Sequence, residues 1–262
     1  IGWQKQAVHH RIVFCYPIFI LHFYIIDVMG KPFFILLCLL AGIYTVRAQN
    51  INDSVRVLFI GNSYTHFNKL PDDIQKIAAT QKIILLYQAC VRGGYSFKKH
   101  LQKQEEIEII KEGKWDFVIL QEHSEAPAKP TEVVAQETYP YARALDSLVH
   151  VYNPKAHVIF YMTWAHKDGC LSPIADYPLI DTYTGMQERL KTSYLEMAYQ
   201  NNAWCAPVGM VWQQVRRERP DYVLYWQDRT HPSPLGTYLA ANVIFSKALS
   251  NVVYKKLTNR TG

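Results

Sequence analysis

Residues 55–63, Val-Arg-Val-Leu-Phe-Ile-Gly-Asn-Ser, decide the fold that the sequence predicts. Val55–Ile60 is a nearly continuous β-branched and apolar run, which is typical of a strand buried on both faces of a parallel sheet. Gly61 permits backbone angles that larger residues resist, and Asn62 tolerates turns. We therefore expect a tight turn that presents Ser63 at the end of the strand.

The rest of the chain alternates strand-like and helix-like segments. Further strands are predicted at residues 83–88, 117–121, 156–162 and 222–225, and helices at 70–81, 96–112, 131–152, 183–201, 207–218 and 233–249. Strands separated by helices of this length pair in parallel through right-handed crossovers. We therefore expect an α/β fold, a three-layer α/β/α sandwich with a mostly parallel, five-stranded sheet. Ligands of such sheets bind beyond the carboxyl ends of the strands.

A second motif, Asp228-Arg229-Thr230-His231-Pro232-Ser233, lies near the end of the chain. A neutral imidazole such as that of His231 can accept a serine proton near neutral pH and return it to a leaving group. Asp228 can bond the other ring nitrogen and stabilise the imidazolium. With Ser63 as the nucleophile, the two motifs supply the groups of a catalytic triad. Each motif alone also fits a simpler role, because Ser63 and the Asp-x-x-His segment could instead cap helices.

A serine hydrolase also needs an oxyanion hole, that is, hydrogen-bond donors for the negative charge that develops on the carbonyl oxygen. The backbone amides of Ser63 and Gly93 are candidates, since a glycine after the second predicted strand lets the backbone approach a ligand closely. Gln121, at the end of the third predicted strand, could add its side-chain amide. A plain turn at Gly93-Gly94 and a strand-end cap at Gln121 are the alternatives.

Together these residues resemble the sequence blocks of the SGNH/GDSL hydrolase superfamily. Gly61-Asn62-Ser63 is similar to its first block, Gly93-Gly94-Tyr95-Ser96 to its second, and Asp228-Arg229-Thr230-His231-Pro232 to its last. The resemblance spans residues 55–249. It implies a flavodoxin-like three-layer fold and ester hydrolysis through an acyl-enzyme, with neither a metal nor a cofactor.

The third block departs from the family pattern. It normally reads Gly-x-Asn-Asp, and the Asn side chain lies in the oxyanion hole. Here the third predicted strand runs into Gln121-Glu122-His123-Ser124-Glu125, without Gly or Asn. Gln121 is chemically closest to the missing Asn, whereas simple alignment of the strand places Glu125 there, and a carboxylate is a poor oxyanion donor. The altered block resembles a branch found among secreted bacterial proteins.

The N-terminal region differs from the rest of the chain. Residues 29–48 fit a secretory signal peptide, with a short basic start, a central apolar run and a small-residue cleavage site ending at Ala48. We expect translation to start at Met29, so that residues 1–28 are an over-extended N-terminus and residues 49–262 form a single secreted or periplasmic domain. A membrane-anchored N-terminus is the alternative, although the run is short for a bilayer span of about 20 residues.

The bulk composition argues against several classes of protein. A chain of 262 residues that is 49% hydrophobic can bury a substantial core. The net charge of +6 is divided evenly between residues 1–48 and the remainder, and no Lys/Arg-rich run marks a nucleic-acid patch. We therefore expect no nucleic-acid partner and no stable membrane insertion of the mature chain.

The cysteines of the predicted mature chain indicate neither a zinc site nor a disulfide framework. Cys90, Cys170 and Cys205 are odd in number, and none lies in a Cys-x-x-Cys or Cys/His motif. A bridge between Cys170 and Cys205 stays open as an alternative. Small buried thiols are the favoured interpretation.

The sequence thus predicts a serine esterase in which Ser63 attacks the ester, His231 transfers the proton and Asp228 orients His231. An acetylated carbohydrate is the favoured substrate, because export would place the enzyme among glycans and aromatic side chains near the rim could stack on sugar rings. The aromatic candidates are Tyr64, Tyr95, Trp164 and Trp226. A lysophospholipase or thioesterase is the enzymatic alternative, and a non-catalytic carbohydrate-binding protein of the same fold is the alternative from another class.

Overall fold

The computed structural model of the protein describes residues 54–250, apart from the side chains of Lys247 and Ala248. The predicted over-extended start at residues 1–28 and the predicted signal peptide at residues 29–48 lie outside the described residues, as does the C-terminal segment 251–262.

Five parallel strands form the central sheet. β1 (Val55–Gly61) pairs with β2 (Leu85–Val91) on one side and with β3 (Phe117–Leu120) on the other, followed by β4 (His157–Tyr161) and β5 (Trp204–Ala206). The strand order β2-β1-β3-β4-β5 is that of flavodoxin-like folds. The predicted α/β class and the parallel, five-stranded sheet are therefore confirmed.

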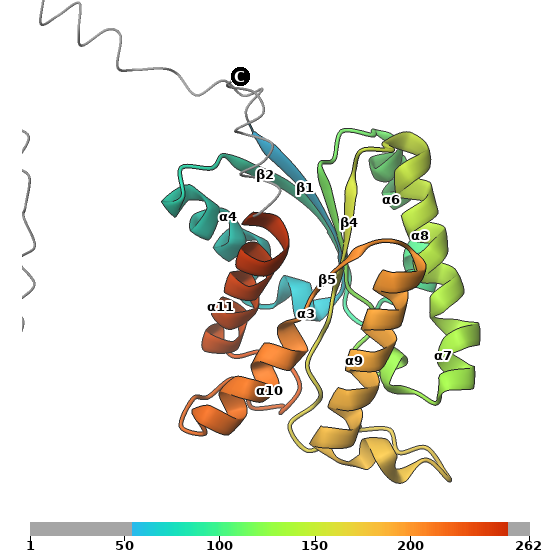
Figure 1. Ribbon diagram of the computed structural model, residues 1–262, viewed down its shortest axis with the longest axis vertical. Helices are drawn as coiled ribbons and strands as arrows, with labels where there is room; N and C mark the ends of the chain where they lie inside the picture. The colour runs from blue at the N-terminus through green and yellow to red at the C-terminus, as the bar shows by residue number, and fades with distance from the viewer. Residues whose placement is uncertain (1–53, 251–262) are drawn as a thin grey trace, which may run out of the picture. The chain divides into compact units, whose positions relative to one another are not determined.

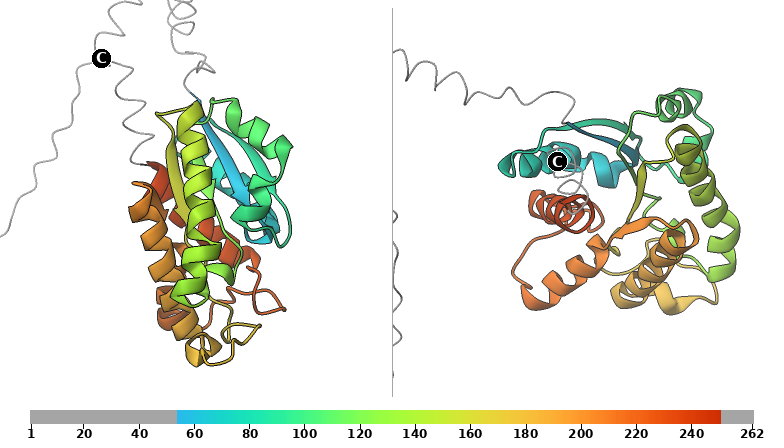
Figure 2. Two further views of the ribbon diagram at one scale, coloured as in Figure 1. Left: turned by 90° about the vertical axis from the view of Figure 1, so that its right-hand side faces the viewer. Right: turned by 45° about the horizontal axis from the view of Figure 1, so that its top comes forward.

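Helices cover both faces of the sheet, so that the sheet is the middle of three layers (Figures 1 and 2). One face carries α4 (Leu70–Thr80), α10 (Val208–Glu218) and α11 (Pro234–Val243), which continues into the π-helical segment η5 (Ile244–Leu249). The other face carries α5 (Phe97–Leu101), α6 (Gln104–Lys111), α7 (Thr131–Glu137), α8 (Tyr139–Tyr152) and α9 (Tyr183–Gln200). Shorter helical segments are α3 (Ser63–His66), η2 (Phe67–Lys69), η3 (Ala126–Ala128) and η4 (Pro178–Asp181).

Alternate residues of β1 enter two separate apolar cores. Val57 and Phe59 pack with α4 and α11, whereas Leu58 and Ile60 pack with α8 and α9 on the opposite face. All four side chains are buried. Successive side chains of a strand point to opposite faces, so a strand covered on both faces needs apolar residues at every position. This explains the continuous apolar run of β1.

The prediction of the fifth strand was wrong. The sheet ends with β5 at Trp204–Ala206, whereas residues 222–225 lie outside the sheet and make only one isolated antiparallel bridge, between Tyr225 and Pro232. β5 is a three-residue edge strand with a half-exposed Trp204, so it carries no periodic apolar pattern. Leu224 and Tyr225 are apolar for another reason, since they are buried in the core that contains α10 and α11.

Two predicted helices are each divided in the structure. The helix expected at residues 131–152 breaks at Thr138, where Pro140 occupies the first turn of α8 and cannot donate a backbone hydrogen bond to a preceding turn. The helix expected at 96–112 divides between Leu101 and Gln104 into α5 and α6. Both breaks leave the layer order unchanged.

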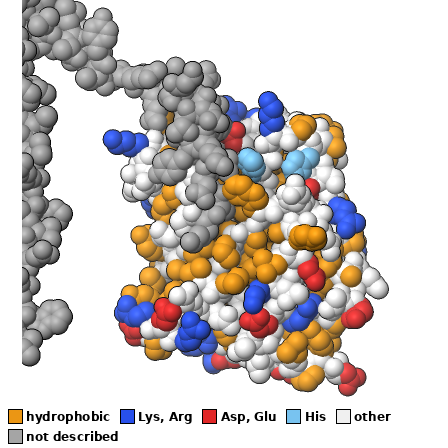
Figure 3. Space-filling model, viewed as in Figure 1, with side chains coloured by type: hydrophobic (Ala, Val, Ile, Leu, Met, Phe, Trp, Pro, Cys, Tyr) orange, Lys and Arg blue, Asp and Glu red, His pale blue; other side chains and the backbone are white. Residues whose placement is uncertain are grey.

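The surface of the domain carries both signs of charge. On the face shown in Figure 3, basic and acidic side chains are interspersed with each other and with apolar ones. Within residues 54–250, no helix combines the length and apolar character needed to span a membrane. Cys90, Cys170 and Cys205 are free thiols, so the bridge between Cys170 and Cys205 that the sequence left open is not formed.

Gly209, in the first turn of α10, leaves no room for a side chain. A Cβ atom there would lie 2.1 Å from the carbonyl oxygen of Thr163 and 2.5 Å from Nε2 of Gln187. We expect Gly209→Ala to lower the free energy of unfolding by about 1–3 kcal/mol, measured by urea denaturation, because α10 must move away from the segment after β4. Gly93→Ala is the control, since a Cβ there meets no atom within 4 Å. Equal losses in both variants would contradict this account.

Candidate active site

Ser63, His231 and Asp228 form a continuous hydrogen-bonded chain. Nε2 of His231 lies 2.9 Å from Oγ of Ser63, and Nδ1 of His231 lies 2.6 Å from Oδ2 of Asp228. A base therefore lies beside the hydroxyl and a carboxylate lies behind the base, which is the arrangement that activates a serine. The fold brings together residues that are 168 positions apart in the sequence.

Residues 222–225, which were predicted as the last strand, instead lie at the base of the loop that carries Asp228 and His231. The N–H of Trp226 donates to the carbonyl oxygen of His231 at 2.8 Å, and the N–H of Ser233 donates to that of Leu224 at 2.9 Å. The two hydrogen bonds close a narrow loop with Asp228 and His231 inside it. Burial of Leu224 anchors this loop in the core.

Asp228 closes its own turn as well as orienting His231. Its Oδ1 accepts hydrogen bonds from the backbone N–H groups of Thr230 at 3.0 Å and His231 at 2.9 Å. Arg229, between Asp228 and Thr230, takes a φ of 66°. Partial burial opposes ionisation of Asp228, but these hydrogen bonds and the one from the His231 ring outweigh it and lower the pKa of the carboxyl. Asp228 is therefore a carboxylate at neutral pH.

Aromatic rings support the imidazole of His231. Phe67 stacks on it at a centroid distance of 4.9 Å, and Tyr64 meets it edge-on at 5.5 Å. Tyr64 in turn stacks on Trp164, whose Nε1 donates to the carbonyl oxygen of Thr230 at 3.0 Å. Tyr64 and Trp164 are buried, so the expectation that they stack on a sugar at the rim was wrong.

Asn62 fixes the turn before Ser63 by joining the ends of three strands. Its Oδ1 caps α3 by accepting the N–H of Tyr64 at 3.1 Å. Its Nδ2 donates to the carbonyl oxygens of Tyr95 and Glu122, at 3.0 and 3.3 Å, in the loops that follow β2 and β3. Asn62 itself is buried, so these hydrogen bonds are shielded from water.

Gln121 pairs with Asn62 and does not offer its amide to the pocket. Its Oε1 accepts the N–H of Asn62 at 3.0 Å and the hydroxyl of Thr65 at 2.9 Å. Its Nε2 donates to Oδ1 of Asn62 at 3.0 Å and also to the carbonyl oxygen of Glu122. The prediction of Gln121 as an oxyanion donor is therefore not met by this arrangement, because a fully buried side chain has both its amide hydrogens engaged elsewhere.

Glycine is required at position 61 because a side chain would not fit there, and not because of the backbone angles. A Cβ atom there would lie 2.7 Å from Oε1 of Gln121 and 2.8 Å from Oγ1 of Thr65. Its φ is not among the positive values of the described residues, so the expectation of an unusual backbone conformation was wrong. The glycine instead leaves room for the Gln121 side chain beneath the turn.

Two backbone amides, those of Ser63 and Gly94, are candidate donors for an oxyanion. Ser63 is the first residue of α3, where helix N–H groups have no intrahelical acceptor. Gly94, with a φ of 66°, lines the pocket beside Ser63, whereas the predicted Gly93 is not among the residues that line it. The second sequence block thus reaches the pocket one residue later than predicted.

The pocket at Ser63 is formed by the loops after the strand ends and has a volume of about 300 Å³. Most of the residues that line it have polar side chains, and several of them were not predicted as site residues. The lining comprises Asn62, Ser63, Tyr64, Gly94, His123, Ser124, Glu125, His166, Leu171, Ser172, Thr230 and His231. His123, Ser124 and His166 follow the carboxyl ends of β3 and β4, and that placement is the signal that could have identified them.

Burial shifts the pKa values of the residues after β3. Burial raises the pKa of Glu122 to about 7, although the N–H groups of His123 and Phe97 donate to its carboxylate and lower it. Burial lowers the pKa of His123, so this ring is neutral at pH 7. The pKa of Glu125 is lowered, because hydrogen bonds from Cys170 and the N–H of Leu171 outweigh its own burial.

A buried network that the sequence did not reveal supports the strand before Ser63. Nε2 of His100 lies 3.0 Å from the carbonyl oxygen of Gly61, and Nδ1 lies 2.5 Å from Oε2 of Glu106. Nε of Arg92 donates to Oε1 of Glu106 at 2.9 Å, and the backbone N–H of Arg92 donates to the carbonyl oxygen of Gly61 at 3.2 Å. The network therefore links β1 with the start of the Gly93-Gly94 loop.

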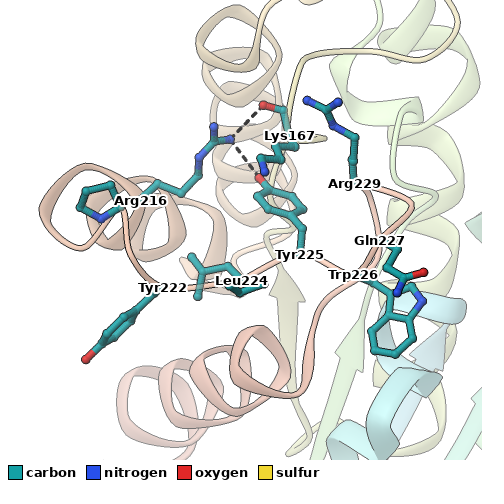
Figure 4. A pocket seen from close by; sticks show the side chains of 10 residues that line it. Lys167, Arg216, Tyr222, Leu224, Tyr225, Trp226, Gln227 and Arg229 are labelled. Carbon is teal, nitrogen blue, oxygen red and sulfur yellow. Dashed lines mark hydrogen bonds between the residues drawn. The ribbon is translucent and has the colours of Figure 1, made fainter.

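A second hollow is lined largely by residues of the segment 220–229 (Figure 4). It has a volume of about 570 Å³ and contains no triad residue. Arg216 donates to the carbonyl oxygen of Lys167 and to the hydroxyl of Tyr225, both at 3.2 Å, and Arg229 pairs with Asp168 at 2.5 Å. Both guanidinium groups thus already have protein partners.

Among residues 54–250, no group of three or more His, Cys, Asp or Glu side chains is placed to hold a metal ion.

The raised pKa of Glu122 makes stability depend on pH. A carboxyl whose pKa is about 7 when folded and 4.5 ordinarily contributes stability at low pH that is lost as the pH rises through 7. We expect the free energy of unfolding of the wild type, relative to Glu122→Gln, to fall by about 2–3 kcal/mol between pH 5 and pH 8. Urea denaturation at several pH values measures this difference, and a constant difference would contradict the assignment.

Replacement of the buried His100 should lower the stability of the fold. His100→Ala leaves Oε2 of the buried Glu106 carboxylate without its partner, although Arg92 still donates to Oε1, and it removes one hydrogen bond to Gly61. We expect a loss of about 1–3 kcal/mol in the free energy of unfolding, measured by urea denaturation. His66→Ala, at an exposed histidine, is the control. A loss no larger than that of the control would mean that the network does not support β1.

Comparisons with known proteins find similarity in structure but not in sequence. No protein-family model matches the chain, and no curated protein resembles it significantly. Solved structures that resemble it include an acetyl xylan esterase (TM-score 0.58, 14% identity, 74% of this chain and 100% of that one). A DUF4886 family protein from Bacteroides uniformis has a TM-score of 0.57 at 18% identity, covering 76% of this chain and 83% of that one. A protein described as a GDSL-like lipase, from Parabacteroides merdae, has a TM-score of 0.52 at 16% identity, covering 73% and 94%. The chain has the fold of the SGNH/GDSL hydrolases.

Proposed function

We propose that this protein is a serine hydrolase that acts on carboxylic esters through an acyl-enzyme. The observation that carries the proposal is the chain from Ser63 through His231 to Asp228, with atom separations of 2.9 and 2.6 Å. A protein that only binds a ligand has no physical need for a nucleophile, a base and an orienting carboxylate in one line. This argues against the non-catalytic carbohydrate-binding alternative.

In the proposed reaction, Oγ of Ser63 attacks the ester carbonyl while Nε2 of His231 takes its proton. Asp228 stabilises the imidazolium that forms. The N–H groups of Ser63 and Gly94 donate to the oxyanion of the tetrahedral intermediate. His231 then protonates the leaving alcohol, and the ester of Ser63 remains. A water molecule, deprotonated by His231, hydrolyses this ester and restores the hydroxyl.

The pocket favours a short acyl group and a polar alcohol. Its volume of about 300 Å³ is at the lower end of the range for ligand pockets, about 300–1,000 Å³. The residues that line it include a single aliphatic one, Leu171, so a long acyl chain would find little space and few aliphatic side chains there. We therefore favour an acetylated carbohydrate over a lysophospholipid or a long-chain thioester. A similar fold in an acetyl xylan esterase is consistent with this choice, as is the export expected from residues 29–48.

Replacement of the nucleophile tests the mechanism. We expect Ser63→Ala to lower kcat for p-nitrophenyl acetate by at least about 10³-fold, because no other hydroxyl of the pocket lies in the line of His231 and Asp228. Release of p-nitrophenol is followed by absorbance. Ser147→Ala, at an exposed serine of α8, is the control. If Ser63→Ala and the wild type hydrolyse the ester at equal rates, the mechanism is wrong.

The length of the acyl chain separates the two enzymatic alternatives. A higher kcat/KM for p-nitrophenyl acetate than for p-nitrophenyl palmitate would support the short-acyl proposal. The reverse order would favour a lysophospholipase or thioesterase.

A further inference from the structure

His166 lines the active-site pocket with two ring nitrogens that have no hydrogen-bond partner. Its side chain is only 4% exposed, and it ends the buried segment that follows β4. Neither Nδ1 nor Nε2 makes a hydrogen bond with any described residue. The same pocket contains Ser63 and His231. Buried polar atoms without partners are uncommon because they cost free energy, and in a binding site the ligand can supply the missing bond.

Glu125 lies near His166 without forming a hydrogen bond to it. Its Oε1 lies 3.5 Å from Nδ1 of His166, which is longer than an ordinary N–H···O hydrogen bond. The same oxygen accepts the N–H of Leu171 at 2.8 Å. The carboxylate is therefore held by the loop that carries Leu171 and Ser172, and both buried nitrogens of His166 are left without a partner.

The hydrogen-bonding capacity of His166 matches that of a hydroxyl group. Burial holds the pKa of His166 below its ordinary value, so the ring is neutral at pH 7 and has one donor and one acceptor. A substrate hydroxyl can donate to one of these nitrogens or accept from the other, whereas an alkyl group satisfies neither. Ser124 and Ser172 line the same pocket and add two more hydroxyls.

We propose that His166 binds a hydroxyl group of the alcohol part of the ester, and that this residue selects polyhydroxylated esters, in particular acetylated sugars, over alkyl esters. The inference rests on the proposed function, since it assigns specificity to the pocket in which Ser63 reacts. Leu171 is the one aliphatic residue among those that line the pocket, so the selectivity is assigned to hydrogen bonds from His166, Ser124 and Ser172.

A pair of acetates with similar rings tests the selectivity. A monoacetylated methyl xyloside and cyclohexyl acetate share the acyl group and a six-membered ring, and they differ mainly in hydroxyl groups. We expect the wild type to favour the sugar acetate by at least tenfold in kcat/KM. In His166→Leu this ratio should fall by about tenfold, and in His166→Gln, which keeps a donor and an acceptor, it should fall less. His150→Gln on α8 is the control and should leave the ratio as in the wild type.

Two results of this experiment would overturn the inference. The first is a wild type that does not prefer the sugar acetate, which needs no folded variant. The second is a His166→Leu protein in which both esters lose activity in equal proportion, because that result indicates a structural role only. Thermal unfolding of each variant establishes that the proteins compared are folded.

Binding of an unesterified sugar separates this inference from the proposed function. Methyl β-xyloside is titrated into wild type and His166→Leu, and binding is followed by protein NMR shifts. We expect the dissociation constant to rise about tenfold or more in the variant. A wild type that hydrolyses neither ester but binds the sugar through His166 would refute catalysis and keep the subsite. Sugar affinity that is equal in both proteins, or no binding to the wild type, would refute the subsite itself.

Discussion

The reciprocal pairing of Asn62 with the Gln121 side chain is the interaction on which the rest of the site depends. The backbone N–H of Asn62 donates to Oε1 of Gln121, and Nε2 of Gln121 donates back to Oδ1 of Asn62, each at 3.0 Å. Both residues are buried at the carboxyl ends of adjacent strands, β1 and β3. Because an unpaired amide at this depth would cost about 1–3 kcal/mol, these bonds hold the Gln121 side chain and the turn at Asn62 in one arrangement. Ser63 follows directly, and its position is set by this pair.

The same pairing explains why the third sequence block differs from the family pattern. With Gln121 engaged beneath the turn, the residue at the strand end is structural, and the pocket wall is formed by the residues that follow it. His123, Ser124 and Glu125 line the pocket in place of a Gly-x-Asn-Asp segment. The departure therefore gives the pocket imidazole, hydroxyl and carboxylate groups after β3. The contact between Ser63 and His231 is formed all the same.

Ser63 and His231 are supported by separate parts of the core. On one face of the sheet, His100 and Glu106 hold the end of β1 through the carbonyl oxygen of Gly61. On the other face, buried Leu224 anchors the loop of His231. Neither support contacts the pocket, yet each sets the position of one reacting group. A relay that requires separations of 2.6–2.9 Å depends on both, since small displacements weaken hydrogen bonds steeply.

The sequence by itself determined the features that have a local signature. The continuous apolar run of β1 predicts a strand covered on both faces, and the turn residues beside Ser63 and His231 predict exposed reactive groups at strand and helix ends. Only the tertiary structure decided that β5 is Trp204–Ala206, that Gln121 turns away from the pocket and that His166 enters it. An edge strand of three residues is too short for a periodic pattern. The direction of the Gln121 amide depends on Asn62 and Thr65, which are 59 and 56 residues away in the sequence, and strand register and helix packing bring such partners together.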